Sequence, residues 1–321
     1  MNVKEYLQKE LPLINLVLEE ELKGLHPSVR QVAEYTLSAG GKRLRPLLTI
    51  LMGRALGYTD KNLYPLACAL EFLHSATLMH DDILDNAHLR RGKKSAHLVF
   101  GLTQTVLAGD GLLALANMIV ARYNLPPLTH CVAEAILKTA SGEIEEIHWL
   151  RNPNLTEDTY LQIIEGKTAF LIQAACLCGA IIANSDEYMQ DKARVYGLNL
   201  GIAFQLVDDA LDYTSVSAIS GKPLGGDLRE GKLTLPLILY LKKLDEDKRK
   251  NLLSKIAENN LSEEEIEEVI TSIQEMGLAE KVRQEAQVFL QKSEKALVNF
   301  PDTLEKEILK KILGLVLSRD K

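Results

Sequence analysis

Apolar residues recur at helical spacing along almost the whole chain. Close to its end, Leu304, Ile308, Ile312 and Val316 stand four residues apart, as one face of an α-helix requires. Alternating runs rich in Val, Ile and Thr, which are typical of strands, are scarce. The pattern predicts an all-α fold. The predicted helices cover residues 3–22, 28–38, 44–57, 61–86, 103–123, 128–149, 157–165, 168–184, 187–213, 233–258, 262–275, 278–298 and 303–318.

Signals for helix ends support several of these boundaries. The pair Ser262 and Glu265 and the pair Asp302 and Glu305 have the spacing of a capping box. The two longest predicted loops, near 87–102 and 214–232, each follow a helix end rich in aspartate, a place where loops commonly carry function. No Ser-, Gly- or Pro-rich linker divides the chain, so we expect a single domain over residues 1–321.

Composition narrows the class of protein. Apolar residues make up 46% of the chain, and only 10 Pro and 20 Gly interrupt it, which favours long helices around a substantial core. The net charge of −7 argues against a broad nucleic-acid surface but leaves room for a small basic pocket. Thus no nucleic-acid partner is expected.

Cysteines and the chain start bear on the cellular compartment. The four cysteines, Cys68, Cys131, Cys176 and Cys178, lie in apolar stretches without a CxxC pair, so we expect reduced core residues. No apolar signal region appears near the start. The longest apolar run, near Leu171–Ala183, is too short to span a bilayer. We therefore expect no transmembrane segment and a cytoplasmic protein.

A short acidic motif occurs twice. Asp81, Asp82 and Asp85 end one apolar helix, and Asp208, Asp209 and Asp212 end another, 127 residues later. Helical spacing places the three carboxylates of each motif along one edge. Two carboxylates ~6 Å apart repel by about 3 kcal/mol at an effective dielectric constant near 20. A hard cation relieves this repulsion, and Mg²⁺ takes carboxylate oxygens together with substrate phosphates. The repeated motif therefore predicts a site for a hard divalent cation at each helix end.

Compact groups of Lys and Arg residues suggest which kind of ligand would bind together with the metal ions. They are the run Gly40–Pro46, which contains Lys42, Arg43 and Arg45, the run Arg90–Lys94, and the pairs Lys167-Thr168, Gly221-Lys222 and Gly231-Lys232. Glycines allow close backbone approach, and Lys and Arg bind phosphate oxygens. Together with the acidic motifs, these groups predict two phosphate sites, one reached through metal and one directly through Arg and Lys.

Up to about residue 240 the chain resembles the trans-type polyprenyl diphosphate synthases. The matching motifs, in order, are Gly40-Gly41-Lys42-Arg43-Leu44-Arg45-Pro46, His80–Asp85, Arg90-Arg91-Gly92, Gly109-Asp110, Lys167-Thr168, Phe204-Gln205 through Asp212, Gly221-Lys222 through Gly225, Asp227-Leu228 and Glu230-Gly231-Lys232. The resemblance implies a large antiparallel helical bundle around a central cavity. It also implies a prenyltransferase that condenses isopentenyl diphosphate with an allylic diphosphate, two or three Mg²⁺ ions per active site, and a homodimer.

The same resemblance assigns roles. Asp81, Asp82, Asp85, Asp208, Asp209 and Asp212 would bind magnesium, some through water. Lys42, Arg45, His74 and Arg91 would bind isopentenyl diphosphate. Arg90, Lys167, Thr168, Gln205 and Lys222 would hold the allylic diphosphate, and Lys232 is a further phosphate candidate. Lys167 and Lys222 join the six aspartates as candidate catalytic residues. One departure is visible: Gly142-Glu143-Ile144-Glu145-Glu146 ends in Glu where the family often has Gln.

The family sets product length beneath the first acidic motif. Ala76 stands five residues before Asp81 and cannot close a pocket as Phe or Tyr would, while Leu73 and Thr77 continue the stripe below Asp81. The motif also lacks a two-residue insertion seen in many short-chain bacterial synthases. These features favour a long product, hexaprenyl to decaprenyl; the alternative is a short-chain farnesyl or geranylgeranyl diphosphate synthase, with a deeper residue closing the tunnel.

Other classes account for fewer of the motifs. Glu71-x-x-His74 and Glu145-x-x-His148 have the spacing of a di-iron carboxylate bundle protein, but iron ligation leaves the repeated acidic motif unexplained. A class I terpene cyclase or head-to-head synthase usually carries a second metal motif with Asn and Ser. A regulatory subunit would be expected to lose acidic motifs. An obligate hetero-partner remains the alternative to a homodimer.

Overall fold

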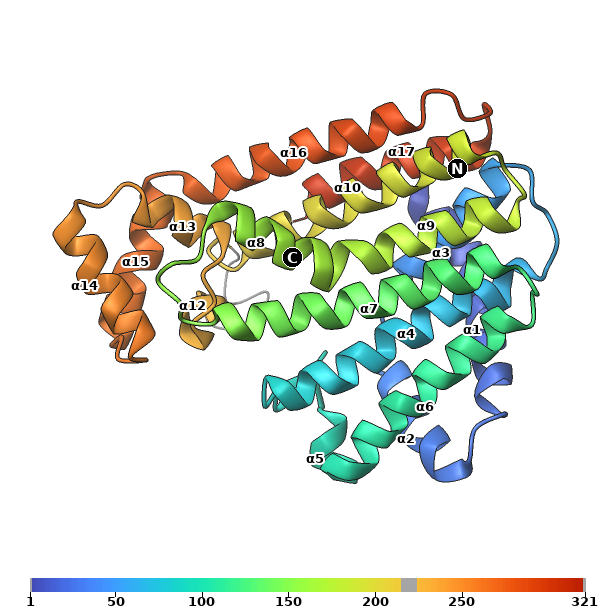
Figure 1. Ribbon diagram of the computed structural model, residues 1–321, viewed down its shortest axis with the longest axis horizontal. Helices are drawn as coiled ribbons and strands as arrows, with labels where there is room; N and C mark the ends of the chain where they lie inside the picture. Colours follow the sequence, from blue (N-terminus) through green and yellow to red (C-terminus); the bar gives the residue numbers. More distant parts are fainter. Residues whose placement is uncertain (1, 215–223, 320–321) are drawn as a thin grey trace. The chain divides into compact units, whose positions relative to one another are not determined.

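The structure, a computed structural model, describes residues 2–214 and 224–319. Helices dominate it, which confirms the predicted all-α class (Figure 1). Among the described residues the only strands are β1 (Leu89–Arg90) and β2 (Lys93–Lys94), which pair antiparallel as a small hairpin in the predicted loop 87–102.

The chain divides into two compact units, each assembled from three separate stretches. Unit 1 comprises Met1–Ile136, Leu171–Arg194 and Asn299–Lys311, and unit 2 comprises Leu137–Phe170, Val195–Val298 and Ile312–Lys321. No single linker separates them, because four of the five crossings from one unit to the other lie within helices. These helices are α7 (Pro126–Trp149), α9 (Phe170–Ile182), α10 (Glu187–Leu211) and α17 (Leu304–Leu317).

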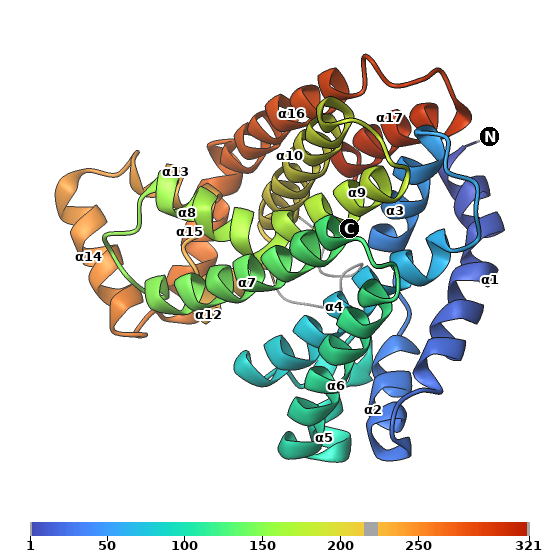
Figure 2. The same ribbon diagram turned by 45° about the vertical axis from the view of Figure 1, so that its right-hand side comes forward.

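Unit 1 is built around long apolar helices. Besides its parts of the shared helices it contains α1 (Val3–Leu22), α2 (Pro27–Leu37), α3 (Leu44–Ala55), α4 (Leu63–Leu84), α5 (Ala96–Phe100) and α6 (Leu102–Ala121). Helix α4 lies beside α6 and also contacts α3 (Figures 1 and 2). In α9 every residue from Leu171 to Ile182 is buried, as expected of a helix that is apolar on all sides.

Unit 2 carries the remaining helices. They are α8 (Glu157–Ile164), the π-helical turn η1 (Glu165–Ala169), α12 (Gly226–Glu230), α13 (Leu235–Leu241), α14 (Glu246–Ala257), α15 (Glu263–Glu275) and α16 (Leu278–Ala296). Helix α13 packs against α15 and α16. The predicted capping box of α15 is confirmed: the Ser262 hydroxyl accepts from the Glu265 amide, and the Glu265 carboxylate accepts from the Ser262 amide.

Several predicted boundaries are wrong for local reasons. The predicted helix 233–258 is two helices, because Asp245 accepts a hydrogen bond from the Lys248 amide and starts α14 there. The predicted helices 157–165 and 168–184 are one continuous run that contains η1. Helix α17 begins at Leu304, so Thr303 rather than Asp302 caps it, accepting from the Lys306 amide. The predicted loops contain the short helices α5 and α12.

Two helical stretches have the length and apolar composition of a membrane span. They are Leu102–Ala121 and the continuous run Glu157–Ile182. In their most apolar windows, 44% and 83% of the residues are buried within the protein. The second stretch exceeds the length expected from sequence because η1 joins α8 to α9. Its burial is that of a core helix, whereas much of α6 faces outward. The four cysteines are free and buried, as predicted.

Candidate active site

The first acidic motif stands at the C-terminal end of α4 in unit 1. The Asn86 amide bonds to the Ile83 carbonyl and the Ala87 amide to the Asp82 carbonyl, with Asn86 at φ 50°, which forms a Schellman ending. The carboxylates thus meet the negative end of the helix dipole as well as one another. Both effects favour a cation beside Asp81 and Asp85.

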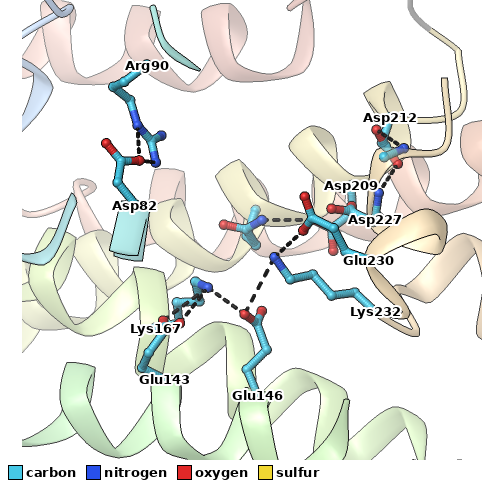
Figure 3. Close-up of polar contacts among 12 residues, drawn as sticks. Asp82, Arg90, Glu143, Glu146, Lys167, Asp209, Asp212, Asp227, Glu230 and Lys232 are labelled. Atoms are coloured by element: carbon cyan, nitrogen blue, oxygen red, sulfur yellow. Dashed lines mark hydrogen bonds and ion pairs between the residues drawn. The ribbon is translucent and has the colours of Figure 1, made fainter. Parts of the chain in front are cut away.

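Asp82 differs from Asp81 and Asp85 in being buried, and it forms an ion pair with Arg90. The Arg90 Nε atom donates to Asp82 Oδ1 at 2.7 Å, and Arg90 Nη2 donates to the same oxygen (Figure 3). This pair ties the predicted phosphate-binding Arg90 to the acidic motif.

Predicted isopentenyl diphosphate ligands gather in unit 1. Burial, together with Arg45 and Arg91, holds the pKa of His74 well below its usual value. Burial lowers the pKa of Arg45 to about 10, and its buried Nε atom has no hydrogen-bond partner within the protein. A Cβ atom added at Gly41 would lie 2.6 Å from Arg91 Nη1, so a larger residue here would have to displace the guanidinium group. His74, Arg45 and Arg91 therefore form a cluster in which the two arginines supply positive charge for an anion and favour the neutral form of His74.

A buried ion pair supports this cluster. Arg43, in the left-handed conformation at φ 46°, donates from Nη1 to Glu71 Oε1 at 2.7 Å and from Nη2 to the Leu37 carbonyl at 2.8 Å. Glu71 is thereby paired with the Arg43 guanidinium.

In the second ExxH pair, Glu145 accepts from Trp149 Nε1 at 3.2 Å. These contacts give no support to the di-iron alternative. In unit 1, Lys42 is exposed next to Arg43, in the loop before α3.

In unit 2 the second acidic motif ends α10. Asp209 is buried; its carboxylate accepts from Tyr160 Oη and, at 2.8 Å, from Gln205 Nε2, while Thr168 Oγ1 donates to Gln205 Oε1 at 2.8 Å. Burial raises the pKa of Asp209 to about 7 and neighbouring Asp208 adds to the rise, although the hydrogen bonds from Tyr160 and Gln205 oppose it. A cation beside Asp209 would stabilise its charged form.

The other two aspartates of this motif have separate partners. The exposed Asp208 pairs through Oδ1 with Arg319 Nη2 at 3.1 Å. Asp212 accepts from the backbone amides of Gly226 and Asp227 at 3.1 and 3.0 Å (Figure 3). Asp227 is itself held close to the motif, and burial together with Asp209 raises its pKa well above the usual range.

Lys167 and Thr168 lie in the π-helical turn η1, a kind of turn that is frequent at functional sites. The turn approaches α7 very closely: a Cβ atom added at Gly142 would lie 2.3 Å from the Lys167 backbone nitrogen. Lys167 Nζ lies 2.5 Å from Glu146 Oε2 and 3.0 Å from Glu143 Oε2. Burial acts to lower the pKa of Lys167, but these carboxylates outweigh it and raise the pKa.

A cavity of about 130 Å³ in unit 2 is lined by Lys167, Thr168, Gln205 and Lys232 among the predicted diphosphate ligands, whereas Arg90 lies in unit 1 and does not line it. Its polar lining residues are Glu146, Tyr160, Lys167, Thr168, Gln205, Asp209, Asp227, Lys232 and Thr234, and its apolar lining includes Trp149, Leu155, Ile163 and Leu233. Lys232 Nζ lies 2.7 Å from Glu230 and 3.9 Å from Glu146 (Figure 3). Lys222 falls outside the described residues.

The donor set fits a hard divalent cation completed by a ligand. In the described part of the chain, no three His, Cys, Asp or Glu side chains converge into a ready-made metal centre. Carboxylate pairs at two helix ends nevertheless suit Mg²⁺, which keeps several waters and takes further oxygens from substrate phosphates. Burial is the main cause of the raised pKa of Asp209, and a cation beside the carboxylate would lower that pKa.

A family model described as polyprenyl synthetase matches residues 26–273. The chain belongs to the polyprenyl synthetase family. It is 33% identical over 319 residues to octaprenyl diphosphate synthase of Escherichia coli, covering 99% of this chain and 98% of that one. It is 31% identical over 324 residues to geranylgeranyl pyrophosphate synthase of Geoglobus acetivorans, with 99% of both chains covered.

The fold agrees with this polyprenyl synthetase membership. The structure matches the crystal structure of a decaprenyl diphosphate synthase from Rhodobacter capsulatus with a TM-score of 0.93 and 34% sequence identity. The match covers 99% of this chain and 98% of the other.

Sequence reasoning missed several residues of this polyprenyl synthetase site. Tyr160 carries no motif, because its hydroxyl reaches Asp209 from 49 positions earlier in the chain. Arg319 lies beyond residue 240, past the motifs that carry the resemblance to the family, yet it pairs with Asp208. The departure at Glu146 was visible, but its contacts with Lys167 and Lys232 were not.

Proposed function

We propose that this polyprenyl synthetase condenses isopentenyl diphosphate with an allylic diphosphate to form a longer trans-polyprenyl diphosphate. The observation that carries the proposal is the unit 2 cavity, which gathers Lys167, Thr168, Gln205 and Lys232 beside Asp209. Such a lining suits a diphosphate accompanied by metal. In unit 1, the cluster of Arg45, His74 and Arg91 suits the second diphosphate.

The chemistry is a substitution in which the allylic C1–O bond breaks and its electron pair leaves with the diphosphate. Lys167 and Lys232 stabilise the charge that develops on the leaving oxygens. Apolar lining residues exclude water from the allylic cation. The alkene of isopentenyl diphosphate then forms the new C–C bond. A proton then leaves the carbon next to the new cationic centre and is taken up by the released diphosphate, so the step balances.

Magnesium is the metal that the donor set favours, and we expect two or three ions per active site because the family resemblance implies them. Bound between carboxylates and phosphates, it would act as a Lewis acid on the leaving group. Asp81, Asp82, Asp85, Asp208, Asp209 and Asp212 are the proposed ligands. Because Asp82 is held by Arg90, that aspartate must either share its carboxylate with the arginine or act through water.

The product is proposed to be long, hexaprenyl to decaprenyl. Ala76 and Leu73 are buried in α4 one to two turns before Asp81, and neither is bulky and aromatic. Thr77 turns its hydroxyl to the His74 carbonyl at 2.9 Å. Relatives named for octaprenyl and for geranylgeranyl products are almost equally similar, at 33% and 31% identity. A short-chain product is therefore the second candidate, and position 76 separates the two.

Assembly and compartment complete the proposal. We expect one domain over residues 1–321 that acts in the cytoplasm as a homodimer. Exposed apolar side chains on α6, among them Leu102, Leu107 and Met118, supply a surface that association would cover.

Replacing an aspartate in each motif tests the function. Asp81→Ala and Asp208→Ala should each lower kcat by orders of magnitude, because diphosphate departure then lacks its charge stabilisation. The measurement is elongation of an allylic primer with radiolabelled isopentenyl diphosphate, with product chromatography and pyrophosphate release. Exposed Asp247→Ala is the matched control and should keep wild-type turnover. Near-normal turnover in either motif variant contradicts the metal assignment.

A further inference from the structure

We infer that Glu146 is a positioning residue that holds Lys167 and Lys232 in the diphosphate site and, through its charge, limits the affinity of that site for diphosphate. The inference rests on the proposed function, because it concerns the same cavity, but it assigns a role that the acidic and basic motifs do not contain.

The geometry places one carboxylate within reach of both lysines. Glu146 Oε2 lies 2.5 Å from Lys167 Nζ and 3.9 Å from Lys232 Nζ (Figure 3). Each lysine also has a second acidic partner: Glu143 at 3.0 Å from Lys167 and Glu230 at 2.7 Å from Lys232. Glu146 is thus a carboxylate near both ammonium groups.

The same three side chains line the cavity together with Asp209 and Asp227. An incoming diphosphate must therefore bind ammonium groups whose charge Glu146 already compensates. It also meets the negative charge of Glu146 itself. Both effects weaken diphosphate binding while they keep the lysine side chains extended into the cavity.

Glutamine separates these two effects. Its amide oxygen still accepts a hydrogen bond from Lys167 Nζ, so the lysine stays in place, but the negative charge is lost. Glu146→Gln should therefore bind diphosphate more tightly rather than more weakly. Loss of one charge at this range corresponds to about a tenfold fall in Kd after solvent screening. Glu146→Ala removes the positioning contact as well, so its gain in affinity should be smaller.

The matched control is the neighbouring residue on α7. Glu145→Gln makes the same change of charge one position away, at an exposed side chain that neither lines the cavity nor pairs with a lysine. A general effect of net charge would alter both variants alike, whereas a role in the site alters only position 146.

The decisive experiment is titration of inorganic pyrophosphate by calorimetry in the presence of chelator, so that no divalent cation contributes. We expect Kd to fall about tenfold in Glu146→Gln and to be unchanged in Glu145→Gln. Binding in Glu146→Gln that equals or is weaker than wild type overturns the inference. So does a failure of both proteins to bind, since Glu146 would then not be what opposes the anion.

Steady-state kinetics give a second readout that a purely structural role would not move. In Glu146→Gln the KM for the allylic diphosphate should fall and inhibition by added pyrophosphate should strengthen, while the KM for isopentenyl diphosphate stays constant. An equal change in both KM values contradicts the inference. A wild-type enzyme without any turnover would refute the proposed function instead, and the pyrophosphate Kd would still decide the role of Glu146.

Discussion

Asp209 shows how strongly one side chain can depend on a ligand. It is buried against Asp208 and Glu146, and it is held by hydrogen bonds from Tyr160 and Gln205. The result is a pKa of about 7 in the folded protein, against 3.8 for an unperturbed aspartate. Between about pH 4 and pH 7, Asp209 therefore keeps its proton in the folded protein, whereas in the unfolded chain it has lost it.

That difference in pKa makes stability depend on pH with a definite sign. Since the folded-state pKa is the higher one, the contribution of Asp209 is fully present below about pH 4 and is lost as pH rises to about 7, at up to roughly 1.4 kcal/mol per pH unit. The measurement is the free energy of unfolding of metal-free wild type minus that of Asp209→Asn between pH 4 and 8. Exposed Asp247→Asn is the control, and a difference that does not fall with pH contradicts the assignment.

Ala76 is the residue that we expect to determine product length. Its side chain is fully buried in α4, so Phe at this position must project into space now used by neighbours or by product. Ala76→Phe should shorten the longest product, as shown by chromatography of radiolabelled polyprenols. Overpacking costs about 1–3 kcal/mol, so Tm must be measured beside it.

The control for Ala76→Phe uses the same helix. Ala67 is equally buried but lies nine residues earlier, half a turn round α4, so Ala67→Phe carries a similar packing cost on the opposite face. Its products should keep wild-type length. Unchanged product length in Ala76→Phe would remove the basis for a long-chain enzyme.

Among the elements, η1 carries two of the predicted site residues, Lys167 and Thr168, but hydrophobic periodicity does not reveal this π-helical turn. A π turn adds one residue to a helix without changing the apolar pattern on either side, so residues 157–184 looked like two helices. The acidic motifs were easier to find, because their spacing on a helix end is itself the signal. Arg319 and Tyr160 were missed, since their contacts depend on tertiary packing rather than on local pattern.

Close contact between α7 and η1 predicts a severe effect of a single methyl group. Gly142→Ala places Cβ 2.3 Å from the Lys167 nitrogen, within a backbone that cannot move cheaply, so we expect a loss of at least about 1–3 kcal/mol in stability. Weaker binding of the allylic diphosphate should accompany it. Thermal unfolding and the KM for that substrate are the measurements.

Gly314 provides the comparison for Gly142. It lies within α17, and nothing stands within 4 Å of the place a Cβ would occupy, so Gly314→Ala should be neutral or stabilise the protein by up to about 1 kcal/mol. If Gly142→Ala were equally harmless, the close approach of α7 to η1 would not exist in solution.

For the molecule as a whole, exposed apolar side chains on α6 predict association. Leu107 and Met118 are 57% and 61% exposed in the single chain. Light scattering should give twice the chain mass of 35.7 kDa for wild type. Met118→Glu should shift the mass towards that of one chain, because burying a charge in an apolar contact is unfavourable. Val298→Glu, at an equally exposed position outside α6, should remain dimeric; a monomeric wild type contradicts the prediction.

The interleaving of the two units has a consequence for biosynthesis. Unit 1 takes its last stretch from Asn299–Lys311, so its packing cannot be completed until residue 311 has left the ribosome. At translation rates of 5–20 residues per second, that moment comes about 15 to 60 s after initiation. Until then the apolar helices of unit 1 lack part of their packing partners, so unit 1 can fold completely only when synthesis is nearly finished.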